Sequence, residues 1–314
     1  MLTQSQIDQF HRDGFVIVRS VLADRELDEL LHAVDRCQAE GIAGTGSDHK
    51  YHVHPDGKKV YRRSEKMWSR AEIFQALTVK PALLEMVGQC IGHPFLPLND
   101  SLVVKLPGGN VPVPWHQDPP YGQPEYAETF EIPNFVADLY LDESTVNNGC
   151  VWGIAGHHLV GHVNMRQFTE EQLFAHPLAQ PIIMKPGDVM LHALSSPHGS
   201  AGNLSETHRR IFYIHYMARE VLAHGYPNIQ WMGLPGLYTD EGKAFARSML
   251  DVRRRLGFRD TASPNVRWTN EGFEVTGTPT TPPRHWKTLR EKISTADVAA
   301  MRQLTWRPTI TANR

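Results

Sequence analysis

The stretch PIIMKPGDVMLHALSSPHGSAGNLSETHRRIFYIHYM (residues 181–217) alternates short apolar runs with turns rich in Gly, Pro, Asn and Ser. Short apolar runs punctuated in this way are typical of the strands of an antiparallel sandwich or barrel. The same texture begins near residue 95 and includes SLVVKL (101–106) and NFVADLYL (134–141). Residues 95–217 therefore predict a mainly β core.

Helical segments precede this β region. Thr3 and Gln6 have the spacing of a capping box, and Asp24 is placed to cap a second helix. Over residues 71–91, apolar side chains recur at helical spacing, which predicts a further helix. The intervening residues 41–64 are polar and rich in Gly and His, so we expect a loop there.

The 314 residues are expected to form one domain, 1–314, in three parts. Residues 1–94 would give mainly helical support, and residues 95–217 the β core with the functional site. Residues 218–314 would form an extension that acts as a lid or makes oligomer contacts. This extension contains a Pro/Gly segment, an arginine-rich helix near 241–255 and a polar extended stretch.

Composition narrows the classes of partner. The 32 Lys and Arg nearly balance the 34 Asp and Glu, which argues against a nucleic-acid-binding protein. No apolar run approaches the ~18 residues that cross a bilayer, and the N-terminus lacks the apolar stretch of a signal peptide, so we expect no membrane partner. Three widely spaced cysteines favour a reducing cytoplasm. The 17 histidines are the unusual count, and histidine is the commonest metal ligand.

One histidine cluster has the spacing of a metal site. The segment Trp115-His116-Gln117-Asp118 follows a strand and a turn rich in Gly and Pro. In an extended chain, residues two apart point the same way, so His116 and Asp118 can reach one metal ion together. His198, in the sequence SSPHGS, is the best candidate for a third ligand from another strand. Two imidazoles and one carboxylate on one face of an octahedral ion form the facial triad of non-haem Fe(II) oxygenases.

A His-x-Asp pattern alone is weak evidence, because about one such pattern arises by chance in a chain this rich in histidine. A second copy, His54-Pro55-Asp56, precedes the β region, and we interpret it as solvated loop. The sequence after His198 favours the first copy, because a polar turn there leads to Arg209 at the start of an apolar strand. An arginine beside a ligand strand can hold a carboxylate through a bidentate pair, although a surface position is the more common alternative.

Taken together, these residues resemble the phytanoyl-CoA dioxygenase family of Fe(II)/2-oxoglutarate oxygenases. The resemblance covers roughly residues 1–217 and is carried, in order, by LTQSQIDQFHRDGFVIVRSVL, WHQD, LDESTVNNGCVWGIAGHH and KPGDVMLHALSSPHGSAGNLSETHRR. It implies a double-stranded β-helix core, of jelly-roll or cupin-like type, with flanking α-helices. By position, it implies that His116, Asp118 and His198 are the iron ligands and the catalytic centre.

The resemblance also implies a cosubstrate site. Arg209 matches the arginine that holds the distal carboxylate of 2-oxoglutarate, Ser200 matches a residue that helps to bind it, and Asn99 matches a polar cosubstrate contact. Strand alternation turns Arg209 and Arg210 to opposite faces, and the family spacing, eleven residues after His198, selects Arg209. The implied activity is hydroxylation of an unactivated C–H bond of a small molecule, with Fe(II) as cofactor, O2 consumed and 2-oxoglutarate converted to succinate and CO2.

Residues that contact the primary substrate are less marked. Asp138 lies where several relatives carry a bulky residue on a pocket strand, so it either meets a polar substrate or pairs with a basic neighbour. Tyr121, in the loop after the ligands, and Trp152 are further candidates, with a surface aromatic and a core aromatic as the respective alternatives. Loops 45–64 and 218–240 are expected to border the mouth of the pocket.

Two other functions compete with this interpretation. One is a facial-triad iron enzyme that does not use 2-oxoglutarate, which would leave Arg209 without a carboxylate to hold. The other is a non-catalytic β-sandwich that senses iron or a ligand, with its triad closed by a fourth protein ligand. The identity of the substrate and the oligomeric state are not specified by these motifs.

Overall fold

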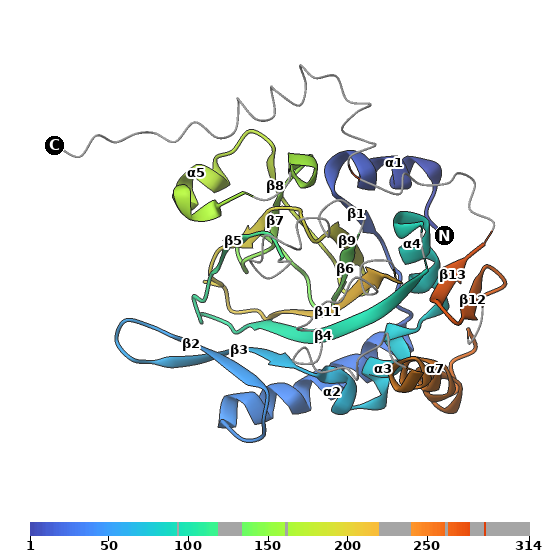
Figure 1. Cartoon of the computed structure of the whole chain (residues 1–314). Helices are drawn as coiled ribbons and strands as arrows, with labels where there is room; N and C mark the ends of the chain where they lie inside the picture. The colour runs from blue at the N-terminus through green and yellow to red at the C-terminus, as the bar shows by residue number, and fades with distance from the viewer. Residues whose placement is uncertain are drawn as a thin grey trace, which may run out of the picture.

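The computed structural model describes residues 1–92, 94–118, 134–160, 163–219, 240–260, 263–276 and 286. It contains two antiparallel sheets with flanking helices (Figure 1). The helices are α1 (Gln4–Asp13), α2 (Asp24–Ala43), α3 (Glu72–Thr78), α4 (Pro81–Ile91), α5 (Glu170–Phe174) and α7 (Asp240–Arg255). The strands are β1 (Phe15–Val18), β2 (His49–Val53), β3 (Lys59–Glu65), β4 (Phe95–Lys105), β5 (Val113–His116), β6 (Phe135–Tyr140), β7 (Trp152–Ile154), β8 (Ala179–Pro181), β9 (Val189–Ala193), β10 (His198–Ser200), β11 (Arg209–Ala218), β12 (Val266–Thr269) and β13 (Gly272–Val275).

The strands between β4 and β11 wind back and forth between the two sheets. The larger sheet has the order β1-β9-β6-β11-β4-β13-β12, with the β2–β3 hairpin attached to β4 through β3. The smaller sheet has the order β5-β10-β7-β8. The chain therefore visits one sheet and then the other from β4 to β11, which is the winding of a double-stranded β-helix. The predicted fold class is confirmed.

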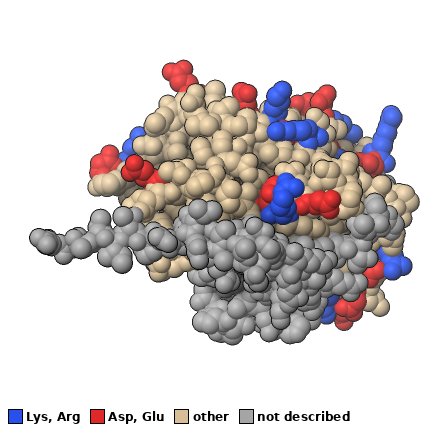
Figure 2. All heavy atoms as spheres, turned by 90° about the horizontal axis from the view of Figure 1, so that it is seen from above, with Lys and Arg blue, Asp and Glu red and all other residues tan. Residues whose placement is uncertain are grey.

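The surface carries charges of both signs. On the face seen in Figure 2, Lys and Arg side chains are scattered among Asp and Glu on a mostly uncharged surface. This mixture agrees with the near balance of charge in the sequence. Within the described ranges, no helix combines the length and the apolar character that crossing a bilayer requires.

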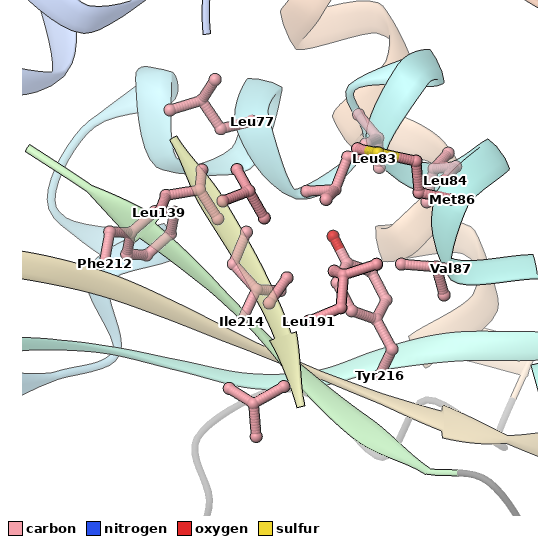
Figure 3. Packing of buried hydrophobic residues seen from close by; sticks show 14 of the residues in the cluster. Leu77, Leu83, Leu84, Met86, Val87, Leu139, Leu191, Phe212, Ile214 and Tyr216 are labelled. Atoms are coloured by element: carbon pink, nitrogen blue, oxygen red, sulfur yellow. The ribbon is translucent and has the colours of Figure 1, made fainter. Parts of the chain in front are cut away.

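The main hydrophobic core lies between the outer face of the larger sheet and the helices. Phe212, Ile214 and Tyr216 of β11 point to this face and are fully buried. Figure 3 shows them packing, together with residues of β6 and β9, toward the apolar side chains of α3 and α4. The Tyr216 hydroxyl donates a hydrogen bond to the Thr78 carbonyl (2.8 Å), so even the polar end of that ring is satisfied.

The opposite face of the same sheet is polar. Because successive strand residues alternate, Arg209, Tyr213 and His215 point away from the helices and toward the smaller sheet. Tyr213 stands opposite Asp138 of β6, and His215 opposite Asn99 of β4. The space between the two sheets is therefore lined by groups that can bind ions, whereas the helix side supplies the apolar packing.

Residues 41–64 contain a hairpin, so the predicted loop is wrong for most of that segment. Strands β2 and β3 pair around a turn at His54-Pro55-Asp56-Gly57. The Asp56 carboxylate accepts from the Lys58 amide (2.9 Å), and Gly57 takes a positive φ of 85°. Pro, Asp and Gly in this order are turn formers, and they make a hairpin possible in a segment that is otherwise polar. The second His-x-Asp pattern, His54-Pro55-Asp56, thus forms the turn between β2 and β3.

The predicted helix over residues 71–91 is two helices. Helix α3 ends at Thr78 and α4 begins at Pro81, because the residue before a proline is driven out of the helical region. Lys80 accordingly has φ −58° and ψ 121°. The predicted cap of α2 is also displaced by one residue. Asp24 is the first helical residue, and the Glu26 side chain accepts from the amide of the capping residue Ala23 (2.9 Å).

The C-terminal part extends the larger sheet. Strand β13 pairs with β4 through Phe273 and Phe95, and helix α7 packs against α3. Strand β1, from the N-terminal part, pairs with β9 at the other edge. The larger sheet thus combines strands from all three of the predicted parts of the chain.

A buried group of charges joins α7 to the N-terminal helices. Arg253 is completely buried and donates to the Glu26 carboxylate (2.7 Å), to the Ala76 carbonyl (3.1 Å) and to Asp260. Lys80 also donates to Glu26 (2.8 Å) and to Asp260 (3.2 Å). Two acids and two bases balance here, which is the condition under which buried charges are tolerated.

Truncating Phe212 tests the core on the helix side. Phe212 is fully buried, and its ring meets that of Phe74 nearly edge to face at 5.0 Å between centroids. Phe212→Ala is expected to lower the free energy of unfolding by about 3–5 kcal/mol, because it leaves a cavity as well as losing apolar burial. Urea denaturation followed by circular dichroism measures this change. Leu204→Ala, at a side chain that is 74% exposed, is the control and should change stability by less than about 0.5 kcal/mol. Equal midpoints for the two variants would contradict the assignment of this core.

Candidate metal centre

Two neighbouring strands of the smaller sheet bring the predicted metal ligands together. His198, at the start of β10, stands directly opposite His116, at the end of β5, and their rings lie 4.3 Å apart. Asp118 follows His116 by two residues and turns to the same side. The strands approach closely because Gly199 has no side chain, and a Cβ there would lie 2.8 Å from the Trp115 ring.

The three side chains have the separation of a metal site. Nε2 of His116 lies 3.6 Å from one Asp118 oxygen, and Nε2 of His198 lies 4.0 Å from the other. One ligand atom from each residue lies within 4.8 Å of the others. Ligands about 2.1 Å from one ion, at neighbouring octahedral corners, lie about 3 Å apart, so small movements would close the set. Two imidazoles and one carboxylate fit iron(II) in a facial arrangement.

Hydrogen bonds orient both imidazoles. Nδ1–H of His116 donates to the Pro114 carbonyl (2.8 Å), and Nδ1–H of His198 donates to the Ser196 carbonyl (3.0 Å). In these tautomers the Nε2 lone pairs face Asp118, which is the usual arrangement of metal-binding histidines. Gln117, between the two ligands in sequence, donates to the Ser195 carbonyl (2.6 Å) and anchors the segment from the other side.

The protonation states suit a cation. Burial raises the pKa of Asp118, but His198 and His116 outweigh it and hold that pKa well below its usual range. Burial lowers the pKa of His198 to about 3, with His116 adding to the effect. Asp118 is therefore ionised and His198 neutral near pH 7, the forms in which both bind a metal. Burial lowers the pKa of His116, but Asp118 outweighs it and raises that pKa, so metal binding would displace a proton from this ring.

A cavity of about 230 Å³ adjoins these three residues and is bordered by both sheets. The described residues that line it are Arg62, Arg63, Ser101, Val103, Val113, His116, Asp118, Val151, His198, Gly199, Ser200, Arg209, Tyr213 and His215. Two of the predicted cosubstrate residues, Arg209 and Ser200, thus share the cavity with the predicted metal ligands.

Arg209 presents an unsatisfied donor to this cavity. The side chain is 1% exposed, and its Nε and Nη2 groups donate to the Gly149 carbonyl (3.2 and 3.0 Å), Nη2 also to the Ser200 hydroxyl (3.3 Å). Its Nη1 group is buried and has no hydrogen-bond partner among the described residues, although the Tyr213 hydroxyl is close to the guanidinium. Arg210 points to the opposite face, where it forms ion pairs with Asp142 and Asp35. A buried guanidinium with a free N–H group is suited to a carboxylate ligand, so the distal carboxylate of 2-oxoglutarate fits this position.

Lys105 stands opposite Arg209 in the register and lies beside it, outside the described lining of the cavity. Its ammonium group donates to the carbonyls of Val111 and Ala201, both at 2.6 Å. Burial, with Arg209 as the next cause, lowers the pKa of Lys105 to about 6. Two basic side chains are thus buried side by side.

The other predicted contacts lie farther from the cavity. Asn99 is on the same face as Ser101, and its buried Oδ1 atom has no hydrogen-bond partner in the described part of the chain. It is not among the described lining residues. Trp152 also lies outside that lining and packs against Phe174, with 5.5 Å between ring centroids. Tyr121, together with the loop 119–133, lies outside the described residues.

Asp138 pairs with a basic neighbour. Its carboxylate lies 3.2 Å from Nε2 of His192, both side chains are almost fully buried, and Asp138 is not among the described lining residues. Burial raises the pKa of Asp138, whereas in His192 the nearby Asp138 outweighs burial and raises the pKa. The His192 ring lies 4.8 Å from that of His198. The pair thus stands behind a metal ligand.

Among the cavity residues that sequence reasoning missed, Arg62 and Arg63 of β3 carry charge. They lie in the segment that was predicted to be a loop, although that segment was expected to border the mouth. The turn His54-Pro55-Asp56-Gly57, with Val60 and Tyr61 after it, is a hairpin signal that could have revealed the strand. Its sheet partner, β4, could not be identified from that signal alone.

Comparison with known proteins agrees with this geometry. Over 248 residues the chain is 25% identical to methylphosphonate hydroxylase of Gimesia maris, covering 78% of this chain and 89% of that protein. It is 24% identical to a probable alpha-ketoglutarate-dependent hypophosphite dioxygenase of Stutzerimonas stutzeri, covering 66% of this chain and 76% of that protein. Among solved structures, EvdMO1 superposes with a TM-score of 0.57 at 26% identity, over 68% of this chain and 49% of that one, about half its length. Residues 10–211, well over half of the chain, match the phytanoyl-CoA dioxygenase (PhyH) family, and the chain belongs to that family.

Proposed function

We propose that this protein hydroxylates an unactivated C–H bond of a small molecule, in a reaction that depends on Fe(II), 2-oxoglutarate and O2. The observation that carries the proposal is the sharing of one cavity by the His116, Asp118 and His198 cluster and the buried Arg209. A metal site together with an unsatisfied arginine donor is what a chelating dicarboxylate requires. The two relatives named as hydroxylase and dioxygenase support the same class of reaction.

The metal ligands are the first part of this assignment. His116, Asp118 and His198 would hold Fe(II) on one face and leave three coordination positions for cosubstrate and O2. When bound, iron and 2-oxoglutarate supply the oxidising chemistry, with succinate and CO2 as coproducts. The protein residues fix the ligands and shield the centre from water. Among the described residues, the cluster of metal-ligating side chains consists of these three residues.

The cosubstrate contacts are the second part. Arg209 would hold the distal carboxylate through Nη1, with the Ser200 hydroxyl, already bonded to Arg209, beside it. Asn99, with its free Oδ1 on the same face of β4 as Ser101, would contribute a polar contact farther along the strand. An iron enzyme that does not use 2-oxoglutarate would leave the Nη1 donor of Arg209 buried without a partner, at a cost of about 1–3 kcal/mol.

The cavity volume and the cysteines bear on the size of the substrate and on the cellular location of the protein. The substrate would be a small molecule, because the cavity of about 230 Å³ lies below the ~300–1,000 Å³ of typical ligand pockets. The three cysteines, Cys37, Cys90 and Cys150, are free and buried, which supports a cytoplasmic location. We treat residues 1–314 as one oxygenase domain, with residues 218–314 as a lid or oligomer contact.

Removing either histidine of the cluster tests the metal site. His116→Ala and His198→Ala are expected to reduce substrate-stimulated succinate formation to background and to abolish tight Co(II) binding, measured by visible absorption. Both side chains border the cavity, so the thermal midpoint of the metal-free protein should change little. His54→Ala, in the β2–β3 turn, is the matched control and should behave as the wild type. Loss of Co(II) binding in His54→Ala, with binding retained in His116→Ala, would contradict this assignment and place the metal at His54 and Asp56 instead.

The two adjacent arginines provide a test of the cosubstrate site. Arg209→Ala is expected to weaken 2-oxoglutarate binding roughly 10- to 100-fold, because a charge-assisted hydrogen bond is typically worth about 1.5–3 kcal/mol. Arg209→Lys should recover only part of this loss, because an ammonium group cannot reproduce the planar fork. Titration of 2-oxoglutarate into the anaerobic Fe(II) protein, followed by its visible charge-transfer band, gives the affinity. Arg210→Ala should leave that affinity unchanged, since Arg210 faces Asp142 and Asp35. The reverse result would place Arg210 in the pocket.

A substitution at Asp138 distinguishes its two proposed roles. If Asp138 supports His192, Asp138→Ala should lower the free energy of unfolding by about 1–3 kcal/mol, because it leaves a buried ring nitrogen without its partner. The substrate KM should then be unchanged. A raised KM with unchanged stability, measured by urea denaturation and succinate formation, would instead make Asp138 a substrate contact.

A further inference from the structure

Two neighbouring arginines border the same cavity as the metal cluster. Arg62 and Arg63 belong to β3, which lies beside β4 in the larger sheet (Figure 1). Arg63 is directly opposite Val103, another lining residue. Arg62 lies at an irregularity of the β2–β3 pairing, between the pairs Tyr61–Tyr51 and Arg63–Lys50, so simple alternation does not separate the two arginines and both line the cavity. With Arg209, the lining thus has three arginines, and Asp118 is the one carboxylate among its described residues. The lining is therefore much more positive than the protein as a whole.

These two arginines are poorly compensated by protein groups. In the described chain Arg63 has one ion pair, from Nε to a Glu65 oxygen at 3.4 Å, and the side chains of Arg63 and Glu65 are each about one-third exposed. Arg62 forms no hydrogen bond or ion pair with any residue of the described chain, although it is half-buried. Burial, followed by the neighbouring Arg63, lowers the pKa of Arg62. Partly desolvated like charges without an anion are unfavourable, so this arrangement suits a ligand that supplies the anion.

A count of formal charges indicates which ligand supplies this anion. The count rests on the proposed function, because it includes Fe(II) and 2-oxoglutarate. In the filled site the charges of Fe(II), Asp118, dianionic 2-oxoglutarate and Arg209 cancel. Lys105, with a pKa of about 6, adds little positive charge near pH 8. The two β3 arginines and Glu65 then leave one positive charge that neither the metal nor the cosubstrate neutralises. The primary substrate is the remaining component of the reaction, so it is the component that can neutralise this charge.

We propose that Arg62, assisted by Arg63, binds an anionic head group of the primary substrate, a carboxylate or a phosphonate. The planar guanidinium fork matches two oxygens of either group. The head group would sit at the β3 edge of the cavity, and the rest of a small substrate would extend toward the metal ligands. The anion and the reacting carbon would then lie at two ends of one cavity of about 230 Å³.

Small anions and a neutral isostere test this proposal. Methylphosphonate, propionate and uncharged propionamide would be titrated calorimetrically into the anaerobic protein loaded with Fe(II) and 2-oxoglutarate. At least one anion is expected to bind, and propionamide at least 10-fold more weakly. Arg62→Gln should weaken anion binding roughly 10- to 100-fold and leave 2-oxoglutarate affinity unchanged. The exposed Lys59, on the same strand, gives the matched control Lys59→Gln, which should bind the anions like the wild type. The tighter anion identifies the head group as phosphonate or carboxylate.

Several outcomes would overturn the proposal. Failure of both anions to bind the loaded protein, equal binding of propionamide, or unchanged anion binding in Arg62→Gln would each do so. A loss of 2-oxoglutarate affinity in Arg62→Gln, with anion binding retained, would assign the arginines to the cosubstrate instead. A wild-type protein that binds neither Fe(II) nor 2-oxoglutarate would contradict the proposed function itself, before the anion is added.

Discussion

The alternation of side chains along β11 is the constraint on which both halves of the molecule depend. This strand is hydrogen-bonded to β4 on one side and to β6 on the other, so its register is fixed twice. A slip of one residue would turn Arg209 toward the helices and Phe212 toward the metal ligands. The apolar core and the polar cavity are therefore two faces of one strand, and packing on the helix side holds the orientation of the site.

The polar interior has an energetic cost that the rest of the fold offsets. Arg209 and Lys105 lie side by side with little exposure, and Asp138 and His192 are almost fully buried. Groups of this kind destabilise a protein when their partners are incomplete, and they concentrate where a ligand completes them. Their burial is tolerated because the large hydrophobic core lies on the other face of the sheet. Ligand binding is then expected to add to stability, because it supplies the missing partner.

The sequence indicated those features that depend on local spacing. The pair His116 and Asp118, the strand of Arg209 and the capping box at Thr3 all follow from residues a few positions apart, and the family resemblance added the fold. The β2–β3 strands were not predicted, because the polarity of residues 41–64 indicated a loop. Their hairpin signal lies in the turn residues Pro55, Asp56 and Gly57. The partners that Glu26 and Asp138 find in Arg253 and His192 could not be predicted, because distant chain segments meet only in the folded protein.

The buried charges around Glu26 also bear on the order in which the chain can fold during synthesis. Glu26 emerges from the ribosome early, whereas Arg253, its fully buried partner, follows more than two hundred residues later. Until then Lys80 is the described basic partner that Glu26 can use, and the face of α3 that α7 will cover remains open to water. Folding of the N-terminal helices is therefore completed only after the β-helix has been translated. At about 5–20 residues per second, this leaves an interval of roughly 9–35 seconds in which a chaperone can reach that face.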